Sequence, residues 1–329
     1  MSYTGRIEIE AVALDAIHHG AGTEGNTQVL RRQETLRPDG TIDSVPFISG
    51  NSIRHMLRNA GVLFALEAMA VEPESLSKAV IDLLFSGGSL GGKNSMTLAK
   101  AKAVEAMFPV LSLLGYSAGN TIASGRIEVW NLHLRCEQNI FRSLSRVDTS
   151  DPRWQLDGNA QTGSQFGTRH DAARIAHAAR FLALPDAERG IVEASAPKGK
   201  TKAPKGEETT QMIYDYETIL PGAEFFGGIV YRGLKEQELD ALVSALSYAC
   251  DGADGSGYLY RVGAKSGTGL GRMRWHFTGL QRPVTPSAMS ESTLLPVLSG
   301  GGSERLEAYK VRLHEHRAAI LSSLEELAA

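Results

Sequence analysis

The sequence contains 329 residues, of which 42% are hydrophobic and 22% are charged, and its formal net charge is −3 at pH 7. This composition is typical of an ordinary globular protein with one elaborated domain or two modest ones, and it argues against a chain coated in positive charge, although a local basic stripe can still bind nucleic acid. No apolar run is long enough to cross a membrane, and the N-terminus lacks a signal-peptide pattern. Cys136 and Cys250 are too isolated for a disulfide framework or a zinc site. We therefore expect a cytoplasmic protein.

The first predicted element is a half-buried strand within residues 6–17, where polar and apolar residues alternate. It ends in the turn-forming run His18-His19-Gly20-Ala21-Gly22. Residues 23–44 are mostly polar and contain the turn Pro38-Asp39-Gly40, which predicts a hairpin or an extended loop. A short apolar strand is predicted next, at residues 45–48.

The following run, Ser49-Gly50-Asn51-Ser52, is a turn that can cap a helix. Apolar residues then recur at the spacing of an amphipathic helix, with a core-facing stripe of Ile53, Met56, Leu57, Ala60 and Phe64. Arg54 and Arg58 lie four residues apart near the helix start, where free N–H groups favour an anion. From this stretch alone two interpretations stay open: a phosphate-binding site, or a solvated helix face with two surface arginines.

Two further helical patterns occupy residues 73–114 and are separated by a glycine-rich run. Strand-like alternation returns from 126 to 136, with a slip in its phase at Asn131. From 138 to about 210 the periodicity fades. The lysine-rich, low-complexity run 196–206 predicts a loop without packed structure, which either stays solvated or tracks a phosphate backbone.

Strands resume at 212–217 and 225–231, and an amphipathic helix is predicted over about 234–250. The glycine-rich loop 263–271 enters a further strand, and the tail 303–328 is predicted to be one charged helix with an apolar stripe. The order of strand, helix, strand, strand, strand, helix, strand, with long insertions, resembles a split βαβ sheet of the ferredoxin-like kind. It places the chain in the α+β class.

Two motifs are candidates for enzyme chemistry. Gly87 to Lys93 satisfies the GxxxxGK spacing of a phosphate-binding loop, but Asn94 stands where a Ser or Thr would hold Mg²⁺, and residues 76–85 predict a helix rather than a buried strand. His18 and His19 could act as general acid and base in RNA cleavage, or they could serve packing and a hydrogen-bonded turn. No other His, Cys or carboxylate set has metal-ligand spacing, so enzyme chemistry is poorly supported and neither a metal nor a cofactor is expected.

Four stretches resemble the RAMP superfamily of CRISPR proteins, in the order and at the approximate spacing of its backbone subunits. They are Ile17–Gly22, Pro46–Arg54, the paired flanks Glu137–Arg142 and Glu217–Phe225, and Gly267–Arg272. Together they cover most of the chain from residue 6 to residue 280. The first two stretches look most like the backbone subunit of type IV, a largely plasmid-borne class.

The resemblance implies a hand-shaped α+β protein with a ferredoxin-like (RRM-like) palm, a helical fingers insertion and a β-hairpin thumb. Gly87 to Lys93 would then be a finger loop and not a nucleotide site. The implied parts are a palm N-terminal strand and loop at 1–50, the palm helix and helical fingers at 51–125, a palm strand at 126–139, the thumb insertion at 140–211, the C-terminal part of the palm at 212–285 and a C-terminal helical tail at 286–329.

The resemblance further implies a non-catalytic CRISPR effector backbone subunit in a ribonucleoprotein of antiviral defence. Several copies would stack head to tail as a filament along a guide RNA and hold it for pairing with target nucleic acid. The expected target is plasmid or phage DNA, and an RNA target is the alternative. Each thumb would displace one base at a regular interval. The implied partners are guide RNA, target DNA, other copies of the chain, other CRISPR effector subunits and a helicase; no membrane is involved.

One departure from the superfamily bears on catalysis. Type III relatives cut target RNA with an Asp in the loop after the first strand, and that position falls near Gly25-Asn26 here, with Glu24 adjacent but offset. We therefore expect no target cleavage by this subunit. The alternative is a RAMP-like endoribonuclease that processes CRISPR RNA with His18 or His19.

Residues that match the superfamily's motifs, together with nearby basic residues, are the candidate RNA-binding set. Those at the glycine turns and helix start would let the backbone approach RNA, and the basic ones would contact phosphates. The set is His18, His19, Arg31, Arg32, Ser49, Asn51, Arg54, Arg58, Arg142, Arg146, Lys265, Gly267, Gly269, Gly271 and Arg272.

Overall fold

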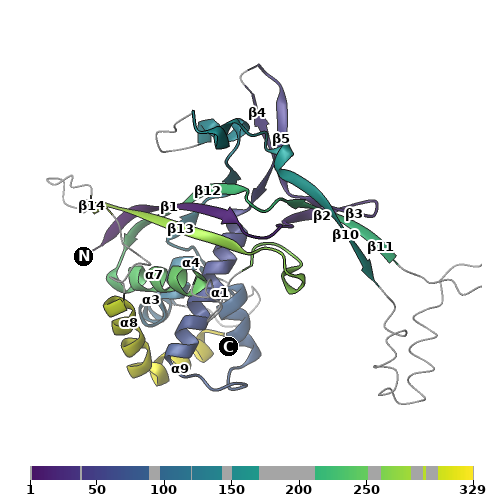
Figure 1. The fold of residues 1–329 in the computed structure, drawn as a ribbon. Helices are drawn as coiled ribbons and strands as arrows, with labels where there is room; N and C mark the ends of the chain where they lie inside the picture. Colours follow the sequence, from purple (N-terminus) through teal and green to yellow (C-terminus); the bar gives the residue numbers. More distant parts are fainter. Residues whose placement is uncertain are drawn as a thin grey trace, which may run out of the picture.

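A computed structural model of the chain describes residues 2–37, 39–88, 97–119, 121–142, 150–169, 212–250, 261–282, 292–293 and 303–328. It contains a main sheet covered on one face by helices, and a second sheet that projects to one side (Figure 1). Within these ranges no helix is long and apolar enough to cross a membrane.

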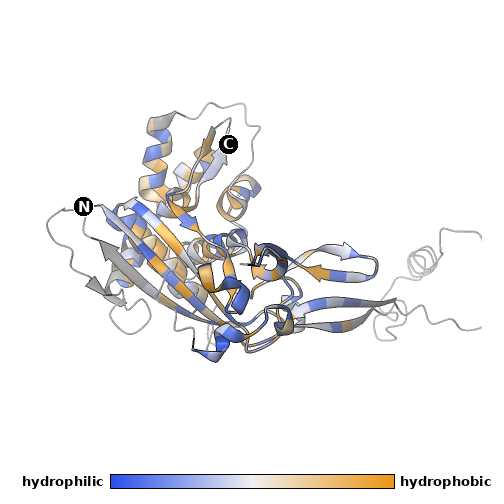
Figure 2. Cartoon of the chain, turned by 90° about the horizontal axis from the view of Figure 1, so that it is seen from above, coloured by the Kyte–Doolittle hydropathy of each residue, from blue (hydrophilic) through white to orange (hydrophobic). Residues whose placement is uncertain are grey.

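The main sheet is built around β1 (Tyr3–Ala13), in which Ile7, Ile9 and Ala11 are buried and alternate with more exposed residues. β1 pairs antiparallel with β12 (Glu224–Leu234) on one side and with β13 (Met273–Arg282) on the other. The same alternation of hydrophobic and hydrophilic residues runs along the neighbouring strands (Figure 2). The alternation in the sequence therefore predicts the covered face of this sheet correctly.

The far side of β12 pairs antiparallel with two short strands, β8 (Ile127–Val129) and β9 (Leu132–Leu134). Because β12 is antiparallel to both β1 and β8, β1 and β8 run parallel with β12 between them, which is the split βαβ arrangement. The predicted α+β, ferredoxin-like fold is confirmed. At the edge beyond β13, β14 (Ser292–Thr293) adds a short pairing.

The slip in the strand pattern at Asn131 marks the break between β8 and β9. The side-chain Oδ1 of Asn131 accepts a hydrogen bond of 2.8 Å from the backbone N–H of Gly50, the first residue of α1 (Gly50–Ala68). A Cβ at Gly50 would lie 2.4 Å from the carbonyl oxygen of Val129, so only glycine fits this contact. The break in the strand therefore positions the start of the helix.

α1 begins at the predicted cap, where Ser49 Oγ accepts a hydrogen bond of 3.3 Å from the N–H of Ser52. Its apolar stripe is buried as predicted. α1 packs against α7 (Glu236–Cys250), and both helices cover the same face of the main sheet (Figure 1). Residues 73–114 supply α2 (Lys78–Ile81), a π-helical turn (Asp82–Ser86), α3 (Leu98–Met107) and α4 (Pro109–Leu114), followed by a small hairpin of β6 (Tyr116–Ala118) and β7 (Thr121–Ala123).

The C-terminal tail forms α8 (Ser303–Glu315) and α9 (Arg317–Ala328) in place of the single predicted helix. Helical hydrogen bonds continue through the junction, since the N–H of His316 bonds the carbonyl of Arg312 and the N–H of Ile320 bonds that of His316. The tail is thus one helical segment with an irregularity at His316. Its buried residues join the main core, where α8 packs on α1 and α7 and α9 packs on α2 and α3.

The polar segment 23–44 forms parts of two hairpins. The first joins β2 (Gly20–Glu24) to β3 (Thr27–Leu30) and belongs to the second sheet. The second joins β4 (Arg32–Leu36) to β5 (Ile42–Ile48) and extends the main sheet, because β5 pairs with β9.

The second sheet has the strand order β10-β11-β3-β2. β10 (Thr162–Arg169) pairs antiparallel with β11 (Met212–Ile219), and β11 pairs parallel with β3. The sequence interpretation placed residues 212–219 in the palm, whereas the structure pairs them outside the main sheet; the partner strand β10 contains Gly163 and Gly167 and gave no strand signal. Most of the expected thumb, at 143–149 and 170–211, lies outside the described residues.

Candidate nucleic-acid interface

A groove of about 480 Å³ opens where the end of the first strand segment, the second sheet and the start of α1 meet. It combines three stretches that the sequence analysis singled out separately: the His-His-Gly turn, the cap of α1 and the glycine-rich loop. Its lining residues are His18, His19, Gly20, Gly22, Thr23, Gln28, Ser52, Gly263 and Ala264.

One side of the groove is a face of the second sheet. The strand registers pair Thr23 with Gln28, Gln28 with Tyr216, and Tyr216 with Gln165, so one row of side chains crosses all four strands. The hydroxyl of Tyr216 donates a hydrogen bond of 3.0 Å to Oε1 of Gln165. The row is polar and aromatic and contains no charged residue.

His18 is buried and belongs to the scaffold of the groove. Its Nδ1 lies 2.7 Å from the carbonyl oxygen of Glu217, which requires Nδ1 to be the donor, and its ring meets that of Tyr216 edge-on at 5.7 Å. The carbonyl of His18 accepts the N–H of Ala264 at 2.9 Å. A Cβ at Gly263, whose φ is +84°, would lie 2.4 Å from that carbonyl oxygen, so the glycine lets the loop approach the histidine backbone.

His19 connects the groove to the helix start. Its Nε2 accepts a hydrogen bond of 3.1 Å from the backbone N–H of Ser49. Burial, together with the nearby Arg31 and His18, lowers the pKa of His19 to about 4. The ring is therefore neutral near pH 7 and acts as an acceptor. Each of the two histidines has one ring nitrogen bonded within the molecule.

Both sequence interpretations, a phosphate-binding site and a solvated helix face, require Arg54 and Arg58 to face a free surface. In the structure the two guanidinium groups bond backbone carbonyls instead. Arg54 donates to the carbonyls of Ile127 (3.0 Å) and Leu114 (2.5 Å), and Arg58 donates to those of Leu114 (3.0 Å) and Gly115 (2.7 Å). Burial, with a smaller contribution from Arg54, lowers the pKa of Arg58 to about 10. The shared helix face predicted from the four-residue spacing turns toward the C-terminal carbonyls of α4, which are natural acceptors for cations. We infer from these bonds that both residues stabilise the start of α1 and do not bind phosphates. Ser49 caps the helix, and Asn51 is exposed.

The glycine-rich loop holds Lys265 over the second sheet. The Nζ of Lys265 lies 4.3 Å from the ring centre of Tyr216 and 4.5 Å from that of Tyr214. The turn that follows exposes Gly267 and Gly269, as expected for backbone that approaches a partner. Gly271 instead serves the chain itself, since a Cβ there would lie 2.3 Å from the carbonyl oxygen of Val262.

Most other predicted basic residues are engaged within the molecule. Arg272 forms a two-pronged ion pair with Asp15 and thereby lowers the pKa of that carboxyl group. Arg32 bonds Asn159 (2.6 Å) and lies near Glu217, and Arg142 bonds Asn139 (3.1 Å).

Two predicted basic residues differ from the others. Arg31 is exposed, and in the described part of the chain its guanidinium has no hydrogen-bond or ion-pair partner, while its N–H bonds the carbonyl of His19 at 2.7 Å. Arg146 lies outside the described residues.

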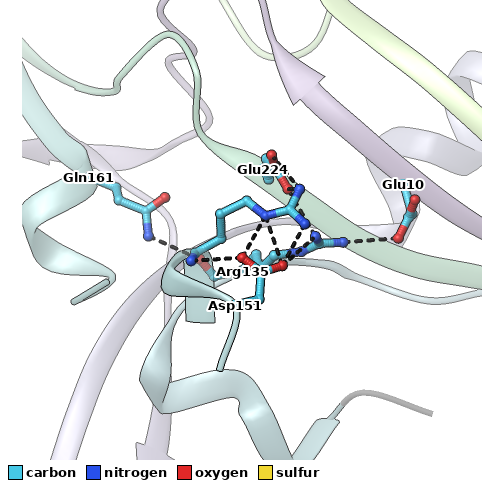
Figure 3. Close-up of polar contacts among 6 residues, drawn as sticks. Glu10, Arg135, Asp151, Gln161 and Glu224 are labelled. Atoms are coloured by element: carbon cyan, nitrogen blue, oxygen red, sulfur yellow. Dashed lines mark hydrogen bonds and ion pairs between the residues drawn. The ribbon is translucent and has the colours of Figure 1, made fainter. Parts of the chain in front are cut away.

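The sequence analysis missed a polar cluster at the root of the second sheet. Arg135, whose side chain is 11% exposed, reaches Glu10 (2.9 Å), Glu224 (3.1 Å) and Asp151 (3.9 Å), as Figure 3 shows. The carbonyl of Arg135 accepts from the side chain of Gln161, directly before β10. Because the partners come from four distant segments, no local pattern in the sequence points to this cluster. Across the ranges that the structure covers, no three His, Cys, Asp or Glu side chains gather as a metal site would require.

Comparison with known proteins gives one family match. Residues 3–84 match the family model described as the CRISPR-associated negative auto-regulator DevR/Csa2. Among solved structures, a chain of a Type IV-B CRISPR complex is 17% identical, with a TM-score of 0.48 over 88% of this chain and 94% of that chain. No curated protein matches the chain. The resemblance to CRISPR proteins predicted from the motifs is thus confirmed for the segment that carries β1, the His-His-Gly turn and α1.

Proposed function

We propose that the chain is a backbone subunit of a CRISPR effector complex, of the type IV kind, and that it binds guide RNA at the groove. The observation that carries the proposal is the meeting of three stretches at one groove: the motif stretches Ile17–Gly22 and Pro46–Arg54 and the start of the glycine-rich loop 263–271. The family match over residues 3–84 supports the CRISPR assignment and covers two of the three stretches.

The distribution of charge favours the groove over the open face of the main sheet as the path of RNA. On the open face β1 places Arg6, Glu8 and Glu10, and the two carboxylates would repel phosphates there. The groove instead has Lys265 and Arg31 nearby. Sequence would be recognised by base pairing while the protein holds the backbone.

The same proposal assigns no cleavage to this subunit. The position aligned with the type III catalytic Asp is the turn Gly25-Asn26 between β2 and β3, where Gly25 adopts a φ of +62°. Nδ1 of His18 and Nε2 of His19 are already bonded within the molecule. Target destruction or unwinding would fall to a partner such as a helicase.

Stacking of copies along the RNA is part of the proposal. The second sheet projects away from the helical body (Figure 1), and we propose that it is the part of each copy that contacts a neighbour on the same strand. The arrangement would present the guide for pairing with plasmid or phage DNA, in a ribonucleoprotein that also contains other effector subunits.

The test is to purify the full chain, incubate it with RNAs of increasing length and follow the mass of the complexes by native mass spectrometry. We expect additional copies to bind in steps as the RNA lengthens, with the RNA left intact. A monomer that binds no nucleic acid would overturn the proposal. Multiple turnover of CRISPR transcripts that His18→Ala or His19→Ala abolishes would replace it with the endoribonuclease alternative.

A further inference from the structure

The groove lacks the groups with which proteins usually hold phosphates. Its lining contributes the hydroxyls of Thr23 and Ser52, the amide of Gln28, two imidazoles and small residues, and none of the lining residues is Lys, Arg, Asp or Glu. Phosphate sites normally supply cationic side chains or unbonded backbone N–H groups. The lining supplies hydroxyl, amide and imidazole groups instead.

The helix start beside the groove does not provide an anion site either. The N–H of Ser49 bonds Nε2 of His19, the N–H of Gly50 bonds Asn131, and the N–H groups of Ser52 and Ile53 bond the carbonyl of Ser49. These are the donors that would otherwise point at a phosphate. With those donors in use, the groove offers its bound partner side-chain hydroxyl and amide groups.

We infer that the groove holds a ribose of the bound strand, with its 2′-hydroxyl among Thr23, Gln28 and Ser52, and that the subunit thereby prefers RNA to DNA. This inference rests on the proposed function, because it names the part of the RNA that enters the groove. A 2′-hydroxyl is both donor and acceptor, as are the groups that line the groove, and it distinguishes RNA from DNA.

The placement of cations agrees with a sugar in the groove. Lys265 follows directly on the lining residue Ala264, and the backbone N–H of Arg31 bonds the carbonyl of the lining residue His19, which places Arg31 beside the groove. The phosphates on either side of a seated ribose would lie toward these two side chains. Charge would then hold the strand regardless of the type of sugar, while the neutral lining would discriminate between RNA and DNA.

The test measures binding of the full chain to a fluorescent RNA and to DNA and 2′-O-methyl RNA of the same sequence by fluorescence anisotropy. We expect RNA to bind roughly tenfold more tightly than DNA, which corresponds to about 1.4 kcal/mol. Thr23→Val, Gln28→Leu and Ser52→Ala should each bring the ratio toward one. Ser164→Ala is the matched control for Ser52→Ala, because Ser164 is exposed and neighbours the row residue Gln165, so it lies on the opposite face of the second sheet.

The outcomes separate this inference from the proposed function. Equal affinity of the wild type for RNA and DNA would overturn the ribose assignment and leave the RNA-binding role in place. A preference for RNA that all three variants retain would also overturn the ribose assignment. So would a change, in any of the three variants, in the relative affinities for RNA homopolymers of different bases, because that result would indicate that a base occupies the groove. Failure to bind any nucleic acid would overturn both. If Gln28→Leu does not fold, Gln28→Glu keeps the shape of the side chain and should weaken RNA binding by charge repulsion.

Discussion

Replacing Arg58 with Met should lower the stability of the protein and leave the RNA affinity of the folded molecule unchanged. The side chain is 8% exposed, and its Nη2 donates to two carbonyls at 3.0 and 2.7 Å. Two hydrogen bonds from a charged donor contribute about 1.5–3 kcal/mol each. Burial of the guanidinium, which lowers the pKa of Arg58 to about 10, offsets about 3 kcal/mol of this. The carbonyl of Gly115 loses its donor and adds to the loss, whereas that of Leu114 still accepts from Arg54. We therefore expect a net decrease of about 1–3 kcal/mol in the free energy of unfolding.

The assay is urea unfolding followed by circular dichroism, paired with RNA binding measured well below the unfolding transition. Arg31→Met is the matched control because Arg31 is exposed; it should weaken RNA binding and leave the unfolding midpoint in place. The reasoning fails if Arg58→Met unfolds like the wild type and yet loses RNA affinity. That result would return Arg58 to the role of phosphate ligand that the helix-start motif suggested.

Three further predictions concern the residues around the groove. Stability should fall as the pH is lowered from about 6.5 to about 4, because His19 and His133, each with a pKa of about 4 in the folded state, take up their protons more readily in the unfolded state. His19→Gln keeps an acceptor for the cap and should reduce the slope of this part of the pH profile of unfolding, with the contribution of His133 left in place. Gly50→Ala should lower the melting temperature, since its Cβ would lie 2.4 Å from a backbone oxygen, whereas Gly267→Ala, with no atom within 4 Å of its Cβ, should not. Lys265→Gln should weaken binding to RNA and DNA alike and reduce the slope of log affinity against log salt by about 1, and an altered ratio of RNA to DNA affinity would contradict the assigned role of this lysine.

The parts of the fold that the sequence predicted are those encoded by periodicity within one segment. The alternation in β1 identified the residues that face the helices, and the 3.6-residue stripe identified the buried face of α1. The slip in the strand pattern at Asn131 was also visible in the sequence. The hydrogen bond by which Asn131 positions the start of α1 was not. In contrast, β10 has Gly163 and Gly167 where a strand pattern would need apolar residues, so its pairing with β11 could not be predicted locally.

The candidate site was predictable in its segments but not in the roles of its side chains. The spacing of Arg54 and Arg58 correctly placed them on one helix face, yet no local pattern states that the C-terminal carbonyls of α4 lie opposite that face. The glycines of the loop were predicted to let the backbone approach a partner, and they divide into two groups. Gly263 and Gly271 approach the protein's own backbone, while Gly267 and Gly269 stay exposed.

This division of the glycines bears on how a protein of net charge −3 could hold a polyanion. Close approach of Gly263 to the backbone of His18 fixes the loop against the groove, and the same loop then carries Lys265 onto the rings of Tyr214 and Tyr216. A lysine held in this way loses little further side-chain entropy when a phosphate arrives, so one positioned cation can contribute more than a mobile one. An interface with few cations is therefore compatible with binding RNA, provided that the scaffold beneath them is rigid. In this chain the scaffold consists of the hydrogen bonds that link residues 16–19, the loop and the cap of α1.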